Sequence, residues 1–287
     1  MRNKILSLIF WIGLTAAACL FLYPTFMNSL ANISQVISIG GYQSELNTLA
    51  DGTLDEEREK ARRYNETIWE EQQEEYFFYR GEEATDELYD STLNLVVDHT
   101  MGYIEVPGLA IYLPITHGTR SQDLDYRAGH MYGTSLPIGG ENTHAVISAH
   151  TGLTTATLFT RLTEMKEGDK FYIHILGESH VYTVDQITVC LPEEESEFIQ
   201  IEEGKDLVTL YTCTPYGIND HRLLVRGERT YPDLISDNSG GQGMSVISKD
   251  KQAILLTVVI GLIPIAILIF GLIRTFRKPR NTNKERP

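Results

Sequence analysis

A cysteine, a histidine and an arginine in the second half of the chain have the surroundings expected for acyl-transfer chemistry. Cys213 ends the alternating run LVTLYTC, and Arg222 opens the run RLLVRG after a short loop. His150 follows a third apolar run, Ala145 to Ala149. A thiolate can attack a carbonyl carbon, an imidazole exchanges protons near neutral pH, and a guanidinium can donate two hydrogen bonds to an oxyanion. These residues could therefore serve as nucleophile, acid/base and oxyanion stabiliser.

The elements around Cys213 should bring its two partners close to it. Alternation along a strand places Cys213 on the face that it shares with Tyr211. A strand, the loop 214–220 and a returning strand bring Arg222 beside it, where a guanidinium stabilises a thiolate. His150 is delivered by the C-terminal end of another strand.

Each of these roles has a rival residue. His221 adjoins Arg222 and could act as the base, although we interpret it as a loop residue. Arg226 shares a strand face with Arg222 and could donate to the oxyanion, although a surface ion pair is its expected role. Asp220 could orient a catalytic group or simply form the turn before the strand. The remaining candidates for metal ligands lack the spacing of a metal site, so we predict neither metal nor cofactor: they are His117, His130, His144, His174 and His180.

The chain contains three cysteines, namely Cys19, Cys190 and Cys213. A Cys190–Cys213 disulfide is the alternative to a reactive thiol. We expect no such bridge, because it would consume the cysteine whose surroundings favour chemistry.

Residues 101–230 have the pattern of a small closed β-barrel. Short runs of β-branched and aromatic residues are broken by Gly, Pro and Asn, and one short helix is predicted near 158–165. The predicted strands are MGYIEV, LAIYLPI, HAVISA, KFYIHIL, HVYTVDQITV, LVTLYTC and RLLVRG.

Two apolar blocks, at about 5–23 and 253–273, are each long enough to cross a bilayer as a helix. The first could instead be a cleaved signal peptide, although its apolar run continues past the small residues at 16–18, which favours a retained anchor. Six cations follow the second block and two precede the first, so the positive-inside rule predicts that both termini are cytoplasmic.

The part of the chain between the two blocks is strongly acidic. Without the eight cations and the one acid of the two termini, 16 of the 24 basic and 38 of the 39 acidic residues remain, a net charge of −22. This balance argues against nucleic acid as a partner. The predicted divisions are an anchor (1–23), juxtamembrane helices with a candidate lid (24–100), the barrel (101–230), a linker (231–252), a second membrane helix (253–273) and a basic tail (274–287).

The segments around the three candidate residues resemble those of sortases. TLYTCTPYG followed by HRLLVRG is similar to the family pattern in which a T-L-x-T-C strand precedes the catalytic arginine by nine positions, and SAHTG is similar to the family's histidine segment. The resemblance covers roughly 101–229. It implies a mainly β fold, a closed eight-stranded barrel, with Cys213, His150 and Arg222 as the catalytic residues.

Further segments, MGYIEVP, GTSLPIGG and CTPY, resemble class C sortases, which polymerise pilins, as does the second membrane helix. Members of that class commonly carry a lid with an Asp-Pro-aromatic motif, but the corresponding region, about 69–89, has no Asp-Pro pair. An aromatic run there could plug the site or could be a surface patch on a helix. It consists of Tyr76, Phe77, Phe78 and Tyr79.

The resemblance implies a two-step transpeptidation at the outer face of a Gram-positive cell membrane. Cys213 would attack the Thr–Gly carbonyl of an LPxTG-like sorting signal, and an amine would release the thioacyl product. We expect the amine to be a pilin lysine. Alternatives are a cell-wall peptide amine, a hydrolase on the same scaffold, and a non-catalytic assembly factor that only binds sorting signals.

Overall fold

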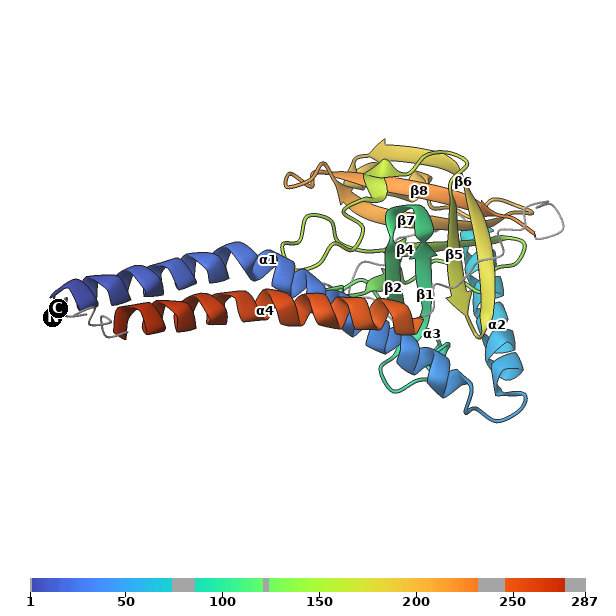
Figure 1. Cartoon of the computed structure of the whole chain (residues 1–287). Helices are drawn as coiled ribbons and strands as arrows, with labels where there is room; N and C mark the ends of the chain where they lie inside the picture. The colour runs from blue at the N-terminus through green and yellow to red at the C-terminus, as the bar shows by residue number, and fades with distance from the viewer. Residues whose placement is uncertain (1, 74–85, 121–123, 232–245, 277–287) are drawn as a thin grey trace, which may run out of the picture.

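The barrel contains every one of the strands in the part of the chain that this computed structural model describes, residues 2–73, 86–120, 124–231 and 246–276. Its eight strands close in the order β1-β2-β3-β4-β7-β8-β6-β5 (Figure 1). The β2–β3 and β4–β7 pairs are parallel, and the others are antiparallel. The strands are β1 (Thr100–Val106), β2 (Ile111–His117), β3 (Ala128–His130), β4 (Thr143–Ser148), β5 (Lys170–Ile175), β6 (Glu178–Cys190), β7 (Asp206–Thr214) and β8 (His221–Arg229).

The predicted closed barrel is confirmed, and each of the seven runs predicted as strands overlaps a strand, although the run LAIYLPI begins two residues before β2. The eighth strand, β3, was not predicted, because three residues (AGH) are too short to show alternation. The helix expected near 158–165 is only a 3-10 turn, η2 (Leu162–Glu164). Two more such turns are η1 (Pro107–Leu109) and η3 (Pro192–Glu197).

Alternating side chains of the strands fill the barrel interior. Val208 and Leu210 of β7 are at most 1% exposed and belong to the main core cluster. Phe171 and Tyr182 stack against each other inside it, with ring centroids 5.4 Å apart. A Cβ atom at Gly227 would lie only 2.6 Å from the Phe171 ring, so a larger residue there would displace this stack.

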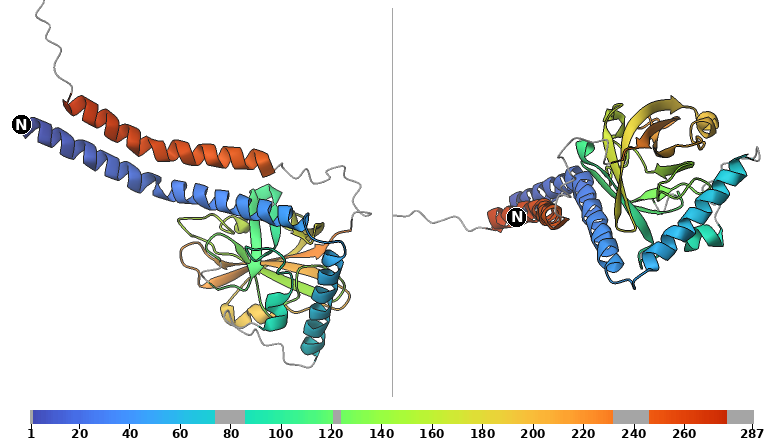
Figure 2. Two further views of the ribbon diagram at one scale, coloured as in Figure 1. Left: turned by 90° about the horizontal axis from the view of Figure 1, so that it is seen from below. Right: turned by 90° about the vertical axis from the view of Figure 1, so that its right-hand side faces the viewer.

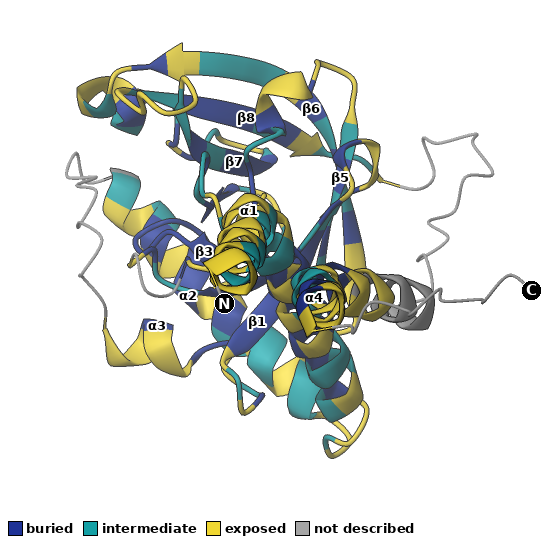
Figure 3. Cartoon of the chain, turned by 60° about the vertical axis from the view of Figure 1, so that its left-hand side comes forward, coloured by how far each residue is buried: buried dark blue, intermediate teal, exposed yellow. Residues whose placement is uncertain are grey.

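Two long helices lie side by side and extend away from the barrel (Figures 1 and 2). They are α1 (Arg2–Leu46), which includes Pro24, and α4 (Val246–Phe276). Each contains an apolar stretch long enough to span a membrane, and Figure 3 shows that their outer turns are largely exposed. Trp11 packs where Gly271 has no side chain, since a Cβ at Gly271 would lie 2.3 Å from the indole. The N-terminal end of α1 and the C-terminal end of α4 therefore lie side by side.

The second half of α1, beyond residue 23, packs against the barrel. The helix continues without a break to Leu46. The Tyr42 hydroxyl accepts a hydrogen bond from the backbone N–H of Leu176 (2.8 Å), and Ile39 is completely buried. α4 likewise begins at Val246, within the stretch predicted as a linker.

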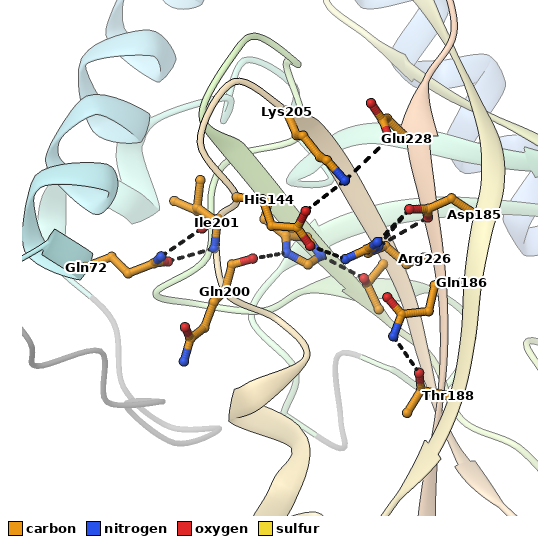
Figure 4. A network of polar contacts seen from close by, with 12 residues as sticks. Gln72, His144, Asp185, Gln186, Thr188, Gln200, Ile201, Lys205, Arg226 and Glu228 are labelled. Atoms are coloured by element: carbon orange, nitrogen blue, oxygen red, sulfur yellow. Dashed lines mark hydrogen bonds and ion pairs between the residues drawn. The ribbon is translucent and has the colours of Figure 1, made fainter.

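Helix α2 (Thr53–Gln73) is fastened to the barrel by two side-chain amides that pair with backbone. Buried Asn65 donates to the Leu136 carbonyl (3.0 Å) and accepts from the Leu136 N–H (2.7 Å). Gln72 makes the same pair of bonds with Ile201, at 3.0 and 2.8 Å (Figure 4). A short helix, α3 (Glu87–Ser91), follows and buries Tyr89 beside the barrel.

We expect Asn65→Ala to lower the free energy of unfolding by about 2–3 kcal/mol, because it leaves a buried backbone N–H and C=O without partners. Urea denaturation of the full-length protein in detergent measures this loss. Glu70→Ala, at an exposed position of the same helix, serves as the control and should change stability by less than about 0.5 kcal/mol. Equal effects of the two substitutions would contradict the role of the Asn65 amide.

Candidate active site

The three predicted catalytic residues lie at, or two residues beyond, the ends of three adjacent strands, β4, β7 and β8. Cys213 of β7 pairs with Arg222 of β8 in the antiparallel register. On its other side β7 pairs in parallel with β4, with Ser148 opposite Tyr211. The Ala149 N–H donates to the Tyr211 carbonyl (3.1 Å) and the Thr212 hydroxyl donates to the Ala149 carbonyl (2.7 Å), so His150 follows a residue that is bonded to β7. Positions opposite each other in a sheet project to the same face, with Cβ atoms about 5 Å apart. Cys213 thus lies opposite Arg222, on a strand whose other neighbour is β4, the strand that precedes His150.

Side-chain hydrogen bonds fix the orientation of Arg222. Its Nε donates to the Tyr211 hydroxyl (2.7 Å), which in turn donates to Glu195 of η3 (2.5 Å). The distance from Nε to the Glu195 carboxylate is 3.7 Å. One terminal nitrogen, Nη1, also reaches the carbonyls of Asn219 and His221, both at 3.3 Å. Among the described residues Nη2 has no hydrogen-bond partner, so the guanidinium keeps donor capacity for a ligand.

Sequence reasoning missed the Glu195–Tyr211 pair. Tyr211 occupies the variable position of the T-L-x-T-C run, and its place on the Cys213 face was the available signal. Burial, reinforced by the Glu195 carboxylate, raises the pKa of Tyr211 well above its ordinary value, so the phenol keeps its proton. Partial burial acts against the Arg222 cation, but Tyr211, Cys213 and Glu195 outweigh it and raise the pKa of the guanidinium. Arg222 therefore stays charged beside the thiol.

Cys190 lies on the other side of Arg222, opposite it in the β6–β8 register. The two cysteines are consequently two strands apart, about 9.5 Å between Cα atoms, whereas a disulfide requires less than about 7 Å. Both thiols are free, as expected, with Cys190 buried and Cys213 partly exposed. Burial, followed by the charge of Glu195, raises the pKa of Cys190, which makes it the less reactive thiol.

The rival residues have other partners. His221 pairs with Asp220 at 2.8 Å on the exposed loop side of β8. Arg226 forms the expected ion pairs, with Asp185 (2.6 Å) and Glu202 (2.5 Å). The charge of its guanidinium is therefore balanced by these two carboxylates, which hold it away from Cys213.

His144 lies within the polar network around Arg226 shown in Figure 4. Its ring nitrogens contact the Gln200 carbonyl and the Thr209 hydroxyl, both at 2.7 Å. His130 is buried in the same way between Tyr89 and the Ser135 carbonyl. Within the described ranges, no group of three or more His, Cys, Asp or Glu side chains is arranged to hold a metal ion.

These buried histidines predict a loss of stability in acid. Burial lowers the pKa of His144 to about 4 and that of His130 to about 3, below the unfolded value of about 6.5. The unfolded chain therefore binds more protons in this window, so stability present above pH 6.5 falls as the pH drops towards 4. Urea denaturation at a series of pH values should show this fall in the free energy of unfolding. His144→Gln should reduce the slope of that free energy against pH by the equivalent of about one proton. An unchanged slope would contradict the assignment.

The candidate lid residues Tyr76, Phe77, Phe78 and Tyr79 lie outside the described residues. The helices on either side, α2 and α3, are described. Asp86, the N-cap of α3, accepts hydrogen bonds from Tyr89 N–H (2.8 Å) and from the Tyr132 hydroxyl (2.6 Å).

Comparisons with known proteins find a matching family model and related sequences. The Sortase domain family model matches residues 104–230. Sortase A of Streptococcus agalactiae serotype III (strain NEM316) is 35% identical over 131 residues, or 45% of this chain and 52% of that protein. Sortase D of Bacillus subtilis (strain 168) is 28% identical, over 45% of this chain and 63% of that protein. The chain thus matches only about half to two thirds of these relatives' lengths.

Solved structures match more of the chain. Sortase C1 of GBS Pilus Island 1 is 38% identical with a TM-score of 0.63, covering 67% of this chain and 96% of that chain. Sortase C of Clostridium perfringens, solved with the C-terminal cell wall sorting motif, is 43% identical with a TM-score of 0.59, covering 68% and 99%. The barrel, the three motif segments and these matches together show that the chain belongs to the sortase family, and that its structural neighbours are class C sortases.

Proposed function

We propose that the protein is a cysteine transpeptidase that cleaves an LPxTG-like sorting signal and transfers the acyl part to an amine. The observation that carries this proposal is the pairing of Cys213 with Arg222 at the ends of β7 and β8, next to β4, whose end His150 follows. Nucleophile, acid/base and oxyanion donor are then within reach of one carbonyl group.

The chemistry proceeds through a thioester. The Cys213 thiolate attacks the Thr–Gly carbonyl carbon, and Arg222 donates hydrogen bonds to the oxyanion. The C–N bond breaks as His150 protonates the departing amine. An acceptor amine, deprotonated by His150, then attacks the thioester and releases Cys213 as a thiolate.

The class C neighbours favour a pilin lysine as the acceptor amine. One neighbour's name includes a pilus island, and another was solved with a cell wall sorting motif. The second apolar helix, α4, agrees with the class C features of the sequence. Transfer to a cell-wall peptide amine is the alternative, and it would use the same three residues.

The two long helices support a membrane-anchored enzyme. We propose that the apolar parts of α1 and α4 cross the cell membrane, with both termini cytoplasmic and the barrel outside. The basic residues at both termini support this orientation.

Trapping the thioester tests the function directly. The full-length protein is incubated with an LPxTG peptide and analysed by mass spectrometry, and we expect an adduct on Cys213 whose acyl part ends at Thr. Adding an amine should convert the product from free acid to amide. Free acid alone would indicate a hydrolase, and the absence of any adduct would favour a non-catalytic binding protein.

Tyr211→Phe should lower kcat about tenfold to a hundredfold with little change in KM. The substitution removes a hydrogen bond to a charged group, worth about 1.5–3 kcal/mol, that orients Arg222 before the oxyanion forms. Steady-state kinetics with peptide and amine separates kcat from KM. Tyr126→Phe, on an exposed tyrosine, is the control. An unchanged kcat would show that Arg222 is oriented without this hydroxyl.

A further inference from the structure

The loop between β7 and β8 exposes two apolar side chains beside the candidate catalytic cysteine. Tyr216 is 66% exposed and Ile218 is 68% exposed. The residues on either side of them, Pro215 to Asp220, are exposed as well. Two large apolar side chains that are this exposed, next to each other on one loop, point to a binding surface.

Contacts through a second loop place this surface close to the end of the first apolar block. Tyr216 lies against Gly152, where an added Cβ would be 3.5 Å from the tyrosine ring. In the same loop, the N–H and hydroxyl of Thr157 both donate to Asn28 of α1 at 2.9 Å. Asn28 is five residues after Tyr23, where the apolar block ends. Five residues of helix rise about 7.5 Å, and the headgroup layer is about 5–7 Å deep on each side.

The orientation of both loops agrees with this placement. In Figure 1 the β7–β8 connection and the loop that follows β4 project towards the side on which the outer ends of α1 and α4 lie, and Figure 2 shows the same from a second direction. The loops therefore face the membrane that these helices would cross.

The charge distribution separates these two loops from the rest of the exported part. That part has a net charge of −22, with 38 acidic residues. Nevertheless the segments 151–160 (TGLTTATLFT) and 214–219 (TPYGIN) contain no charged residue. Carboxylates there would be costly to desolvate and would be repelled by anionic lipids, so this composition suits contact with a bilayer.

We propose that the active-site end of the barrel rests on the lipid headgroup layer, with Tyr216 and Ile218 as its contacts. Tyrosine favours this layer, because its ring is apolar and its hydroxyl stays hydrated. Cys213 would then lie close to the membrane surface. A sorting signal on a membrane-tethered substrate could reach it there. The proposal rests on the proposed membrane topology and is independent of the chemistry at Cys213.

Lipid quenching in nanodiscs tests this contact. The full-length protein carries one environment-sensitive fluorophore on a single cysteine, in a background where the other cysteines are alanine, Cys213→Ala included. The probe positions are Ile218→Cys, the native Cys19 in the apolar block, and Val97→Cys. Val97 is 85% exposed, and its N–H bonds to Glu45, near the far end of α1. The nanodiscs contain phosphatidylcholine with or without nitroxide-labelled lipid.

We expect nitroxide lipids to reduce the fluorescence of probes at positions 19 and 218 and to leave the probe at 97 unchanged. Quenching at 19 but not at 218 would overturn the proposal while the membrane span stands. Quenching at neither position would overturn both. Contact of the loop with a second copy of the protein would leave position 218 unquenched and would count against the proposal. Because Cys213 is absent, failure of the transpeptidase assignment cannot produce any of these results.

Discussion

Cys213→Ala should abolish transpeptidation, with a loss of at least about 10⁴-fold in kcat. Without the thiolate no thioester forms, and the remaining Arg222 and His150 can only assist attack by water or amine on an unactivated peptide bond. The assay measures amide product from an LPxTG peptide and an added amine. Because Cys213 is partly exposed at a strand end, its removal should change stability by less than about 0.5 kcal/mol.

Cys190→Ala is the matched control for this experiment. Both cysteines lie opposite Arg222, one on each neighbouring strand, and both carry free thiols. We expect Cys190→Ala to retain nearly full activity in the folded protein, and alkylating reagents to modify Cys213 first. If the Cys190 variant were the inactive one, the nucleophile would be assigned to the wrong strand.

Arg222→Lys should lower kcat by about 10²–10³-fold while KM changes little, because the lost donors act on charge that develops in the transition state. Lysine keeps the positive charge but offers a point charge in place of a planar fork. It also cannot reproduce the bond that Arg222 Nε makes to Tyr211. A loss confined to KM would instead indicate that the arginine only binds the substrate.

Arg226→Lys provides the comparison on the same strand. This arginine lies four residues further along β8, and its ion pairs with Asp185 and Glu202 hold it away from the cysteine. We expect its kcat to stay within about threefold of the parent. Equal losses in the two variants would mean that the charge of β8 as a whole matters, and not one oriented donor.

The sequence predicted the barrel because its strands are long enough to alternate. β5, for example, reads KFYIHI with every second residue buried, and the runs ending at Cys213 and beginning at Arg222 lie in paired strands. The position of His150 relative to this pair depends on the parallel register of β4 and β7. The sequence suggests where these strands end, but it does not determine how they are aligned.

Other features could not be predicted, for identifiable physical reasons. β3 has three residues and is defined only by its neighbours, since it pairs in parallel with β2 and antiparallel with β4. The continuation of α1 past Tyr23 depends on burial of Ile39 and Tyr42 against a barrel that begins more than fifty residues later. The Glu195–Tyr211 contact joins two residues whose meeting requires the turn η3 to fold back over β7.

The connection between β6 and β7, residues 191–205, is fastened at both of its ends. Gln72 of α2 binds Ile201 through two backbone hydrogen bonds, while Glu195 binds the phenol that orients Arg222. These contacts restrict the movement of the segment between Glu195 and Ile201. A displacement of this connection would therefore also disturb the Glu195–Tyr211 pair, and with it the bond that orients the Arg222 guanidinium.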